Sequence, residues 1–336
     1  MAKKVLILTL SVLLVAGLAW AQNTKMGTAG AQELRIPVGS RGTAMAGTVI
    51  ADASGAEAMF WNPAGATRAS GVQAFLSYRS YLADMTVSYF GVSSQSGYGT
   101  VGVSAKILSL GDIVVTTVND WDGTGEVYSI NVPVLGLTYS YALTDRVSFG
   151  ATAMYVNEEV MQSTARGVAF DFGFQYAPGW RTLRLGMVMK NYGPRMEFSG
   201  PDFEVSTSVP GDDPEAANRS LALTSAGYEL PSSFQIGATY DLGLGENGIA
   251  TVGAVFQSNS FSSDEYRIGA EYNLSERLYV RGGYVICDQE SYIYGPTLGF
   301  GARFNLGTVK ASIDYSHTFV SKYFDDIPEI SMKFGL

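Results

Sequence analysis

Apolar and polar side chains alternate along most of the chain after residue 71. Every second residue from Val168 to Tyr176 is apolar, for example, and the residues between them are small or polar, as at Asp171. An alternation with a period of two residues is the pattern of a β-strand with two unlike faces. It predicts fourteen strands, at residues 72–81, 84–95, 98–108, 127–142, 145–157, 164–177, 182–192, 230–243, 247–258, 263–275, 277–287, 293–304, 307–319 and 326–336.

The length of these strands and the place of their charges favour a membrane barrel over a water-soluble β-sandwich. Strands of ten or more residues are long for a soluble protein but suit a tilted strand that crosses a membrane. A lipid-facing Arg or Lys would cost roughly 2–4 kcal/mol at the membrane centre, and the apolar faces carry almost no charge. We therefore expect an all-β fold, a 14-stranded antiparallel transmembrane β-barrel. Its interior would hold the charges of the polar faces, namely Lys106, Asp171, Arg184, Lys190, Arg267, Glu271, Arg281, Arg303, Lys310, Asp314 and Lys333.

The connections between the predicted strands alternate in length. Short turns at 143–145, 274–276 and 305–307 follow the fourth, tenth and twelfth strands, whereas long connections at 109–126 and 193–229 follow the third and seventh. Outer-membrane barrels have short periplasmic turns and longer outer loops, so both ends of the barrel chain should be periplasmic. The connection 193–229 is rich in proline and acidic residues, and we expect it to be an exposed outer loop.

Residues 22–71 do not follow the strand pattern and contain many small residues. Such a segment can pack inside a barrel as a plug, although a periplasmic extension is the alternative. Asn62 is a good helix N-cap and Pro63 a good first helical residue, so residues 62–67 should form a short helical turn. Trp61 precedes this turn and could anchor it against an apolar surface.

The first 21 residues have the features of a secretory signal peptide. Lys3 and Lys4 precede an apolar run at 5–18, and the small residues Ala19 and Ala21 fit a cleavage site before Gln22. An uncleaved membrane anchor is the alternative, but the apolar run is short for a membrane span. We therefore predict a signal peptide at 1–21, a plug at 22–71 and a barrel at 72–336, placed in the bacterial outer membrane.

Composition narrows the classes of function. Charged residues are 16% of the chain, below the roughly 25% of soluble domains. The net charge of −9 becomes −11 without Lys3 and Lys4, which argues against nucleic-acid binding. The single cysteine excludes an intramolecular disulfide and a cysteine-rich metal site. The only histidine, His317, follows Ser316 on a predicted strand, so the two point to opposite faces and cannot pair directly for catalysis. We expect no enzyme activity, metal or cofactor.

Two stretches carry a resemblance to a known family, LRIPVGSRGTAMAG at 34–47 and GAEAMFWNPAG at 55–65. Together they resemble the N-terminal signature of the PorV/PorQ family, in the superfamily of the long-chain fatty-acid transporter FadL. The triplet Asn62, Pro63 and Ala64, between Trp61 and Gly65, resembles the NPA box of that superfamily. The resemblance implies a fourteen-stranded barrel with an N-terminal plug.

Two functions follow from this resemblance. The FadL side implies transport of hydrophobic small molecules, gated by the plug around Asn62. A purely structural role of Asn62 and Pro63 remains the alternative. The PorV side implies a component of type IX secretion that binds secreted cargo or other secretion components, with the loop 193–229 as a contact surface. The candidate lumen residues are Arg35, Arg41, Asp171, Arg267, Glu271, Arg281, Arg303 and Asp314.

Several partners are expected for such a protein. They are outer-membrane lipid, the barrel-assembly machinery, a hydrophobic ligand and the type IX components. The last strand, 326–336, is amphipathic with an aromatic residue near its end, and it resembles a barrel-assembly signal. Arg35 and Arg41 could contact lumen acids such as Asp171 or Glu271, and solvent exposure is the alternative.

Overall fold

The computed structural model describes residues 25–207, 219–244, 248–274, 277–289, 292–321 and 324–336. The predicted signal peptide, the middle of the connection 193–229 and part of the turn 274–276 lie outside the described residues.

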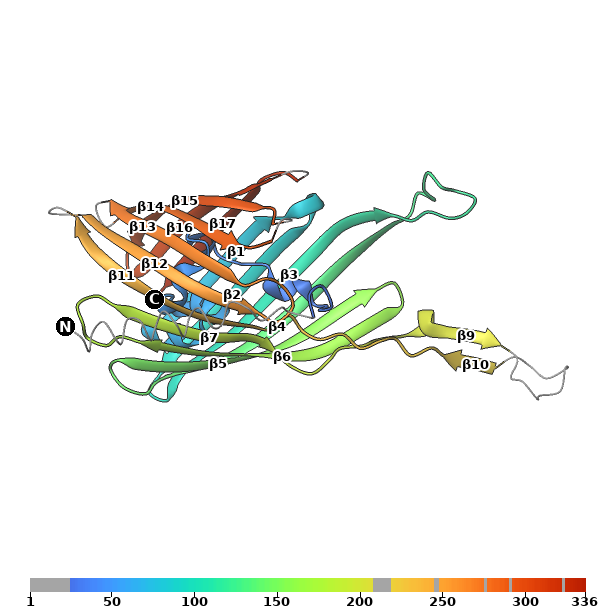
Figure 1. Cartoon of the computed structure of the whole chain (residues 1–336), viewed down its shortest axis with the longest axis horizontal. Helices are drawn as coiled ribbons and strands as arrows, with labels where there is room; N and C mark the ends of the chain where they lie inside the picture. Colours follow the sequence, from blue (N-terminus) through green and yellow to red (C-terminus); the bar gives the residue numbers. More distant parts are fainter. Residues whose placement is uncertain (1–24, 208–218, 245–247, 275–276, 290–291, 322–323) are drawn as a thin grey trace.

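Within these residues, fourteen antiparallel strands close into a barrel (Figure 1). The first strand of the ring pairs with the last, with Phe75 opposite Lys333, so the ring has no free side. The sheet has a fifteenth strand, the two-residue β8, which pairs with β6 but is not one of the strands that form the ring. The ring strands are β1 Val72–Ser80, β2 Thr86–Ser96, β3 Gly99–Val114, β4 Val127–Ala142, β5 Val147–Val160, β6 Ser163–Tyr176, β7 Arg184–Tyr192, β11 Ser233–Leu244, β12 Gly248–Asn259, β13 Glu265–Leu274, β14 Leu278–Cys287, β15 Tyr294–Leu306, β16 Val309–Val320 and β17 Ile327–Gly335.

Each ring strand overlaps one predicted strand, which confirms the predicted fold. The predicted end of the third strand, at residue 108, is wrong. β3 runs on to Val114, because Asp112–Val114 pair with Val127–Ser129 after an irregularity in the register. Residues 109–130 therefore form a long hairpin, the β3–β4 arm, which projects beyond the ring in Figure 1.

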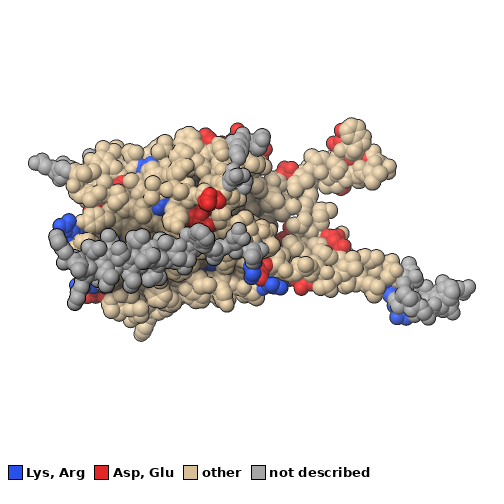
Figure 2. All heavy atoms as spheres, in the orientation of Figure 1, with Lys and Arg blue, Asp and Glu red and all other residues tan. Residues whose placement is uncertain are grey.

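The alternation along the strands separates an inner from an outer face. Phe172 is 39% exposed on the outside of the ring, whereas its neighbour Asp171 is 2% exposed on the inside. Other large exposed apolar residues, such as Ile236 and Phe300, occupy the same outward positions on their strands. Figure 2 shows that most of this wall consists of uncharged residues. The outer wall therefore has the apolar character of a surface that faces lipid.

The two ends of the barrel differ in their connections. One end, the turn end, carries short turns such as 97–98, 143–146 and 307–308. The other, the loop end, carries the β3–β4 arm and the connection between β7 and β11. The connection between β1 and β2 at the loop end is short and contains η5, Leu82–Asp84. The longest described connections lie at the loop end, as predicted. The alternation is not strict, however, because the loop-end connection 161–162 is as short as a turn and the turn-end connection 177–183 is longer.

The connection after β7 is only partly exposed, which corrects the expectation for 193–229. It contains β8 Phe198–Ser199, η6 Pro201–Phe203, β9 Glu204–Thr207 and β10 Arg219–Ala222. β9 and β10 project from the loop end (Figure 1). Met196, however, is 1% exposed and packs with Val156 and Ala165 of the wall. An apolar residue next to the wall gains more from burial than from exposure to water.

The plug, residues 25–71, lies inside the ring (Figure 1). Its elements are η1 Gln32–Arg35, α2 Ser40–Ala44, η2 Thr48–Ala51, η3 Gly55–Glu57, α3 Ala58–Trp61 and η4 Pro63–Arg68. Its apolar side chains pack among themselves and against the inner wall, as Met59 does beside Phe75 and Tyr89. Among the described residues, no helix is long and apolar enough to cross a membrane.

Candidate functional site

The triplet that resembles the NPA box lies where the plug meets the wall. Asn62 caps η4, because its Oδ1 accepts a hydrogen bond from the Ala64 amide at 3.2 Å. Its Nδ2 donates to the carbonyls of Ile50 in η2 at 2.8 Å and Phe174 in β6 at 3.0 Å. One buried amide thus ties together its own turn, a second plug helix and the wall. Pro63 begins η4, where its missing N–H is not needed.

The residues around the triplet are equally enclosed. Trp61 is 4% exposed and packs against Met45 and Val49 of the plug. The Ala64 carbonyl accepts a hydrogen bond from Ser140 of β4 at 3.1 Å. A Cβ atom on Gly65 would lie 2.0 Å from the Ala53 carbonyl oxygen, so a side chain does not fit there. These contacts give the triplet a structural role, because they hold the plug against the inner wall of the barrel.

Glycines of the wall let the plug backbone approach closely. A Cβ atom on Gly173 would lie 2.0 Å from the Asn62 Oδ1, and one on Gly186 would lie 2.5 Å from the Ile50 carbonyl oxygen. The same holds for Gly150, whose Cβ would lie 2.3 Å from the Pro63 carbonyl carbon. At these three points the plug therefore lies directly against the wall backbone.

A network of ion pairs joins the plug to the wall in the turn half of the barrel. Arg41 of the plug donates to Glu271 at 3.0 Å and to Asp52 at 2.7 Å. Arg281 donates to the same Glu271 and, at 2.7 Å, to Asp314. All five side chains are largely buried. Buried charges are tolerated when each is paired in this way, and Lys333 and Glu57 form a further pair.

A second buried pair was not among the predicted lumen residues. Arg79 of β1 donates to Glu329 of β17 at 3.1 Å, and both side chains are almost wholly buried. Glu329 also accepts from the Ser77 hydroxyl at 2.6 Å. The alternation of the sequence could have revealed Arg79 as a lumen residue, since Arg79 and Ser77 share the polar face of the first predicted strand.

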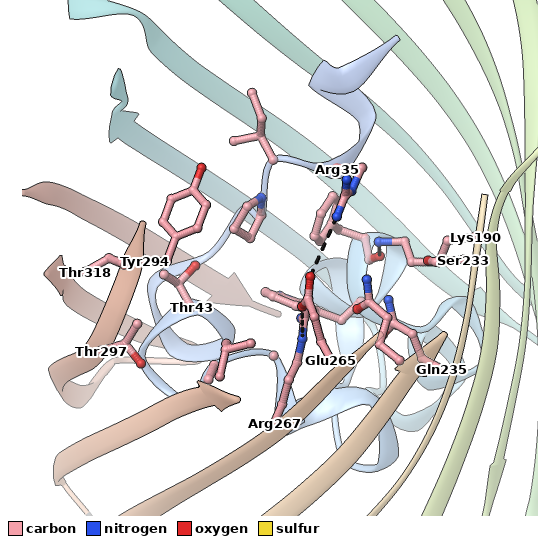
Figure 3. A pocket seen from close by; sticks show the side chains of 18 of the residues that line it. Arg35, Thr43, Lys190, Ser233, Gln235, Glu265, Arg267, Tyr294, Thr297 and Thr318 are labelled. Atoms are coloured by element: carbon pink, nitrogen blue, oxygen red, sulfur yellow. Dashed lines mark hydrogen bonds and ion pairs between the residues drawn. The ribbon is translucent and has the colours of Figure 1, made fainter. Parts of the chain in front are cut away.

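A pocket of about 290 Å³ lies on the loop side of the plug (Figure 3). The plug contributes the apolar or aromatic residues Ile36, Phe60 and Trp61 to its lining, and also the polar residues Arg35 and Thr43. The wall contributes further polar side chains, labelled in Figure 3. They include Lys190, Ser233, Gln235, Glu265, Arg267, Tyr294, Thr297 and Thr318.

The charges of this pocket are unevenly paired. Arg267 forms a close ion pair with Glu265 at 2.5 Å, and Arg35 reaches the same carboxylate at 3.7 Å. Lys190 donates to the Phe60 carbonyl at 2.7 Å, and its nitrogen lies 3.6 Å from the centre of the Phe60 ring. Among the described residues, Lys190 has no carboxylate within ion-pair distance. The pocket therefore has an excess of positive charge.

The structure brings together some of the predicted lumen residues and separates others. The expected contact of Arg41 with Glu271 is present, whereas Arg35 pairs with Glu265. Asp171 instead accepts a hydrogen bond from the Asn191 amide at 2.7 Å. Arg303 is not an enclosed lumen residue, because it lies near the turn 307–308, where it is exposed and stacks on the Tyr279 ring at 4.2 Å.

Two acids of the loop half face one another. Glu33 of η1 is 5% exposed, and Glu158 of β5 also bonds the Tyr228 hydroxyl. Burial, together with repulsion from Glu158, raises the pKa of the Glu33 carboxyl to about 7. The carboxyl can therefore change its charge near neutral pH.

The residues that could suggest catalysis or metal binding are not assembled into a site. Ser316 is buried on the inner face, whereas His317 lies on the other face and contacts Asp326 at 2.9 Å. The described part of the chain contains no cluster of three His, Cys, Asp or Glu side chains that could hold a metal ion.

Comparisons with known proteins rest on structure alone. No protein-family model and no curated protein matches the chain. The monoaromatic hydrocarbon channel CymD is similar, with a TM-score of 0.54 and 15% identity over 89% of this chain and 97% of CymD. A FadL homologue of Pseudomonas aeruginosa has a TM-score of 0.52 and 13% identity over 89% and 97%. The toluene transporter TodX of Pseudomonas putida has a TM-score of 0.52 and 13% identity over 85% and 94%. The chain therefore has the fold of the FadL-like channels.

Proposed function

We propose that this protein is a transport barrel of the bacterial outer membrane, through which hydrophobic small molecules pass under the control of the plug. The observation that carries the proposal is a plug that is seated inside a closed barrel and leaves a pocket on the loop side. The similar structures bear the names of hydrocarbon channels and a toluene transporter. Their fold supports the proposal, although their identities of 13–15% carry over no substrate.

The membrane location rests on the outer wall. A closed ring satisfies all backbone hydrogen bonds between its strands, so it can lie in lipid without unpaired N–H or C=O groups. Its outward side chains are apolar at positions such as Phe172, Ile236 and Phe300. The expected signal peptide at 1–21 agrees with export of the chain.

Control by the plug follows from its close seat. The plug lies against the wall at Gly173 and Gly186 on one side and at Gly269 and Gly283 farther round the ring. We therefore expect a molecule in the pocket to reach the turn end only when part of the plug moves. A disulfide between plug and wall would prevent this movement reversibly. Thr48 and Gly253 lie close enough to be bridged. A Cβ on Gly253 would lie 2.9 Å from the Thr48 Cβ, closer than the roughly 3.5–4.5 Å between the Cβ atoms of a disulfide, so η2 has to move slightly away from β12 when the bond forms.

The test measures uptake of radiolabelled toluene by Gram-negative cells that express the protein. Thr48→Cys and Gly253→Cys are combined in a Cys287→Ser background, and each single cysteine variant serves as a control. We expect the oxidised double variant to take up little toluene and to recover after reduction. Equal uptake before and after reduction would contradict control by the plug. Toluene uptake no higher than in cells without the protein would contradict transport of hydrocarbons.

The β3–β4 arm favours a second candidate, a component of type IX secretion that binds cargo or partner proteins. Val118 is fully exposed and Trp121 is 77% exposed on this arm. Residues 109–130 of the arm hold four acids, Asp112, Asp120, Asp122 and Glu126, and neither Lys nor Arg, so the arm suits a basic partner. Both projections carry acidic groups (Figure 2). A pulldown with the unchanged protein should recover the partner, and a pulldown with the double variant Val118→Ser and Trp121→Ser should lose it. Recovery of abundant membrane proteins alone by both proteins would argue against this role.

A further inference from the structure

The size of the pocket limits what it can hold. Small-molecule pockets usually measure roughly 300–1,000 Å³, and this one, at about 290 Å³, lies at the lower end. A long acyl chain would not fit within it. A single six-membered ring with one or two substituents is of the right size.

The plug side of the pocket suits an aromatic ring. Phe60 and Trp61 stand nearly at right angles with their ring centres 5.2 Å apart, and Ile36 lies beside them in the lining. Aromatic rings pack favourably edge to face against such a pair. This half of the pocket alone would accept a hydrocarbon.

The charged side of the pocket, formed by wall residues and by Arg35 of the plug, favours a ligand with a negative charge. Arg79 is matched by Glu329 and Arg267 by Glu265. Lys190 donates to a backbone carbonyl and lies over the face of Phe60, and its nearest acid, Asp171, is beyond ion-pair distance. Arg35 shares the carboxylate that Arg267 holds more closely. A carboxylate between Lys190 and Arg35 would complete these two cations with charge-assisted hydrogen bonds.

The same wall holds carboxamide oxygens without a hydrogen-bond donor. Oε1 of Gln235 and Oε1 of Gln257 are buried and unpartnered within the described residues, and both side chains line the pocket. Both oxygens are shielded from solvent, so the carboxamide has to turn about its last torsion to present an oxygen to a ligand. Because buried polar groups are normally satisfied, a ligand hydroxyl at Gln235 would stabilise the turned carboxamide.

We infer that the pocket binds a small hydroxylated aromatic carboxylate, with its ring on Phe60 and Trp61, its carboxylate at Lys190 and Arg35, and a hydroxyl at Gln235. This inference rests on the proposed transport function, since it names the class of molecule that the barrel admits. It departs from the plain hydrocarbons in the names of the similar structures, because a hydrocarbon would leave the charged wall unmatched.

Isothermal titration of the purified full-length protein in detergent tests each part of the inference with ligands of equal shape. The probe is 4-hydroxybenzoate. In p-cresol a methyl group replaces the carboxylate, and in 4-methylbenzoate a methyl group replaces the hydroxyl. We expect 4-hydroxybenzoate to bind roughly tenfold or more tightly than either analogue, as loss of a charge-assisted or buried hydrogen bond implies. Equal affinities for all three would overturn the inference.

Two variants place the ligand in the pocket. Lys190→Gln should weaken binding of 4-hydroxybenzoate roughly tenfold to a hundredfold. Lys106→Gln is the matched control, because Lys106 is as deeply buried and also lies over Phe60, at 5.0 Å from the ring centre, but does not line this pocket. Gln235→Leu should abolish the preference for 4-hydroxybenzoate over 4-methylbenzoate. Heat-modifiable gel mobility checks that each variant folds, and equal weakening by Lys106→Gln would place the ligand elsewhere.

The inference and the proposed function can fail separately. If 4-hydroxybenzoate binds selectively but expressing cells take up neither it nor toluene, transport is contradicted and the pocket assignment stands. If toluene uptake depends on the unlocked plug while 4-hydroxybenzoate shows no selective binding, the ligand class is contradicted and transport stands.

Discussion

The two halves of the lumen treat charge in different ways. In the turn half, Glu271 lies between Arg41 of the plug and Arg281 of the wall, and Arg281 also reaches Asp314. In the loop half, Glu265 is the one acid among the charged residues that line the pocket, against Arg35, Arg79, Lys190 and Arg267. The first arrangement is nearly neutral, and the second is positive.

This difference gives the two halves separate roles: the turn half holds the plug, and the loop half can bind a ligand. A closed network of paired charges costs much to break, because each partner would be left charged and buried. An open set of charges beside an aromatic pair can instead be completed by a molecule from outside. The plug is thus fastened at one end and forms part of a binding surface at its other end.

The largest effect should come from breaking the turn-half network. Glu271→Leu leaves Arg41 and Arg281 without their shared carboxylate, so the free energy of unfolding should fall by about 3–5 kcal/mol. Denaturant unfolding in detergent measures it. Glu229→Leu is the matched control, because Glu229 also lies between two cations, Lys25 and Arg195, but at the exposed loop end. A similar loss in both variants would contradict the distinction.

A smaller effect should come from the seat of the plug. Gly173→Ala would place a Cβ 2.0 Å from Asn62 Oδ1, and such overpacking typically costs about 1–3 kcal/mol. Gly282→Ala is the control, since the nearest atom to its Cβ would be a Leu298 methyl carbon at 3.5 Å. Limited proteolysis of the plug should be faster in the first variant alone. Unchanged protection would show that the plug is not held at this point.

A change in the pocket should sharpen the comparison further. Glu265→Gln removes the acid that Arg35 and Arg267 share, so both cations become available to an anionic ligand. The affinity for 4-hydroxybenzoate should then rise, by roughly two- to fivefold if the effect equals that of one ion pair. Titration of p-cresol, which has no charge at neutral pH, should show no such gain. Weaker binding of the anion would indicate that Glu265 itself contacts the ligand.

The smallest effect concerns pH. The pKa of Glu33 is raised to about 7 by burial and by Glu158, so the docked η1 holds a proton that a free carboxyl would lose. Its contribution to docking is present at low pH and is lost as the pH rises through about 7. Hydrogen exchange at residues 32–35, corrected for the intrinsic rate, should accelerate as the pH rises from about 4.5 to about 7 and should level off above that. Glu33→Gln should remove this dependence, and an unchanged profile would assign it to another group.

Much of the barrel could be predicted because it depends on local pattern. Asp171 and Phe172 must point to opposite sides of any strand, so their positions follow from the alternation alone. Asn62 caps its own turn through the Ala64 amide, two residues away. The extension of β3 into the β3–β4 arm was not predicted. Its pairs with β4 form after a register irregularity and beyond Ser109, where β3 no longer pairs with β2.

The sequence by itself determined the strands, their inner and outer faces, and the cap of the plug turn, since each depends on residues a few positions apart. Only the tertiary structure decided which charges meet, as when Arg41 reaches Glu271, 230 residues away, and Arg35 reaches Glu265. Such pairs depend on how the ring closes and how the plug is seated in it. The same closure leaves Lys190 without a carboxylate within ion-pair distance among the described residues, and the Gln235 Oε1 without a hydrogen-bond donor. No local sequence pattern predicts either.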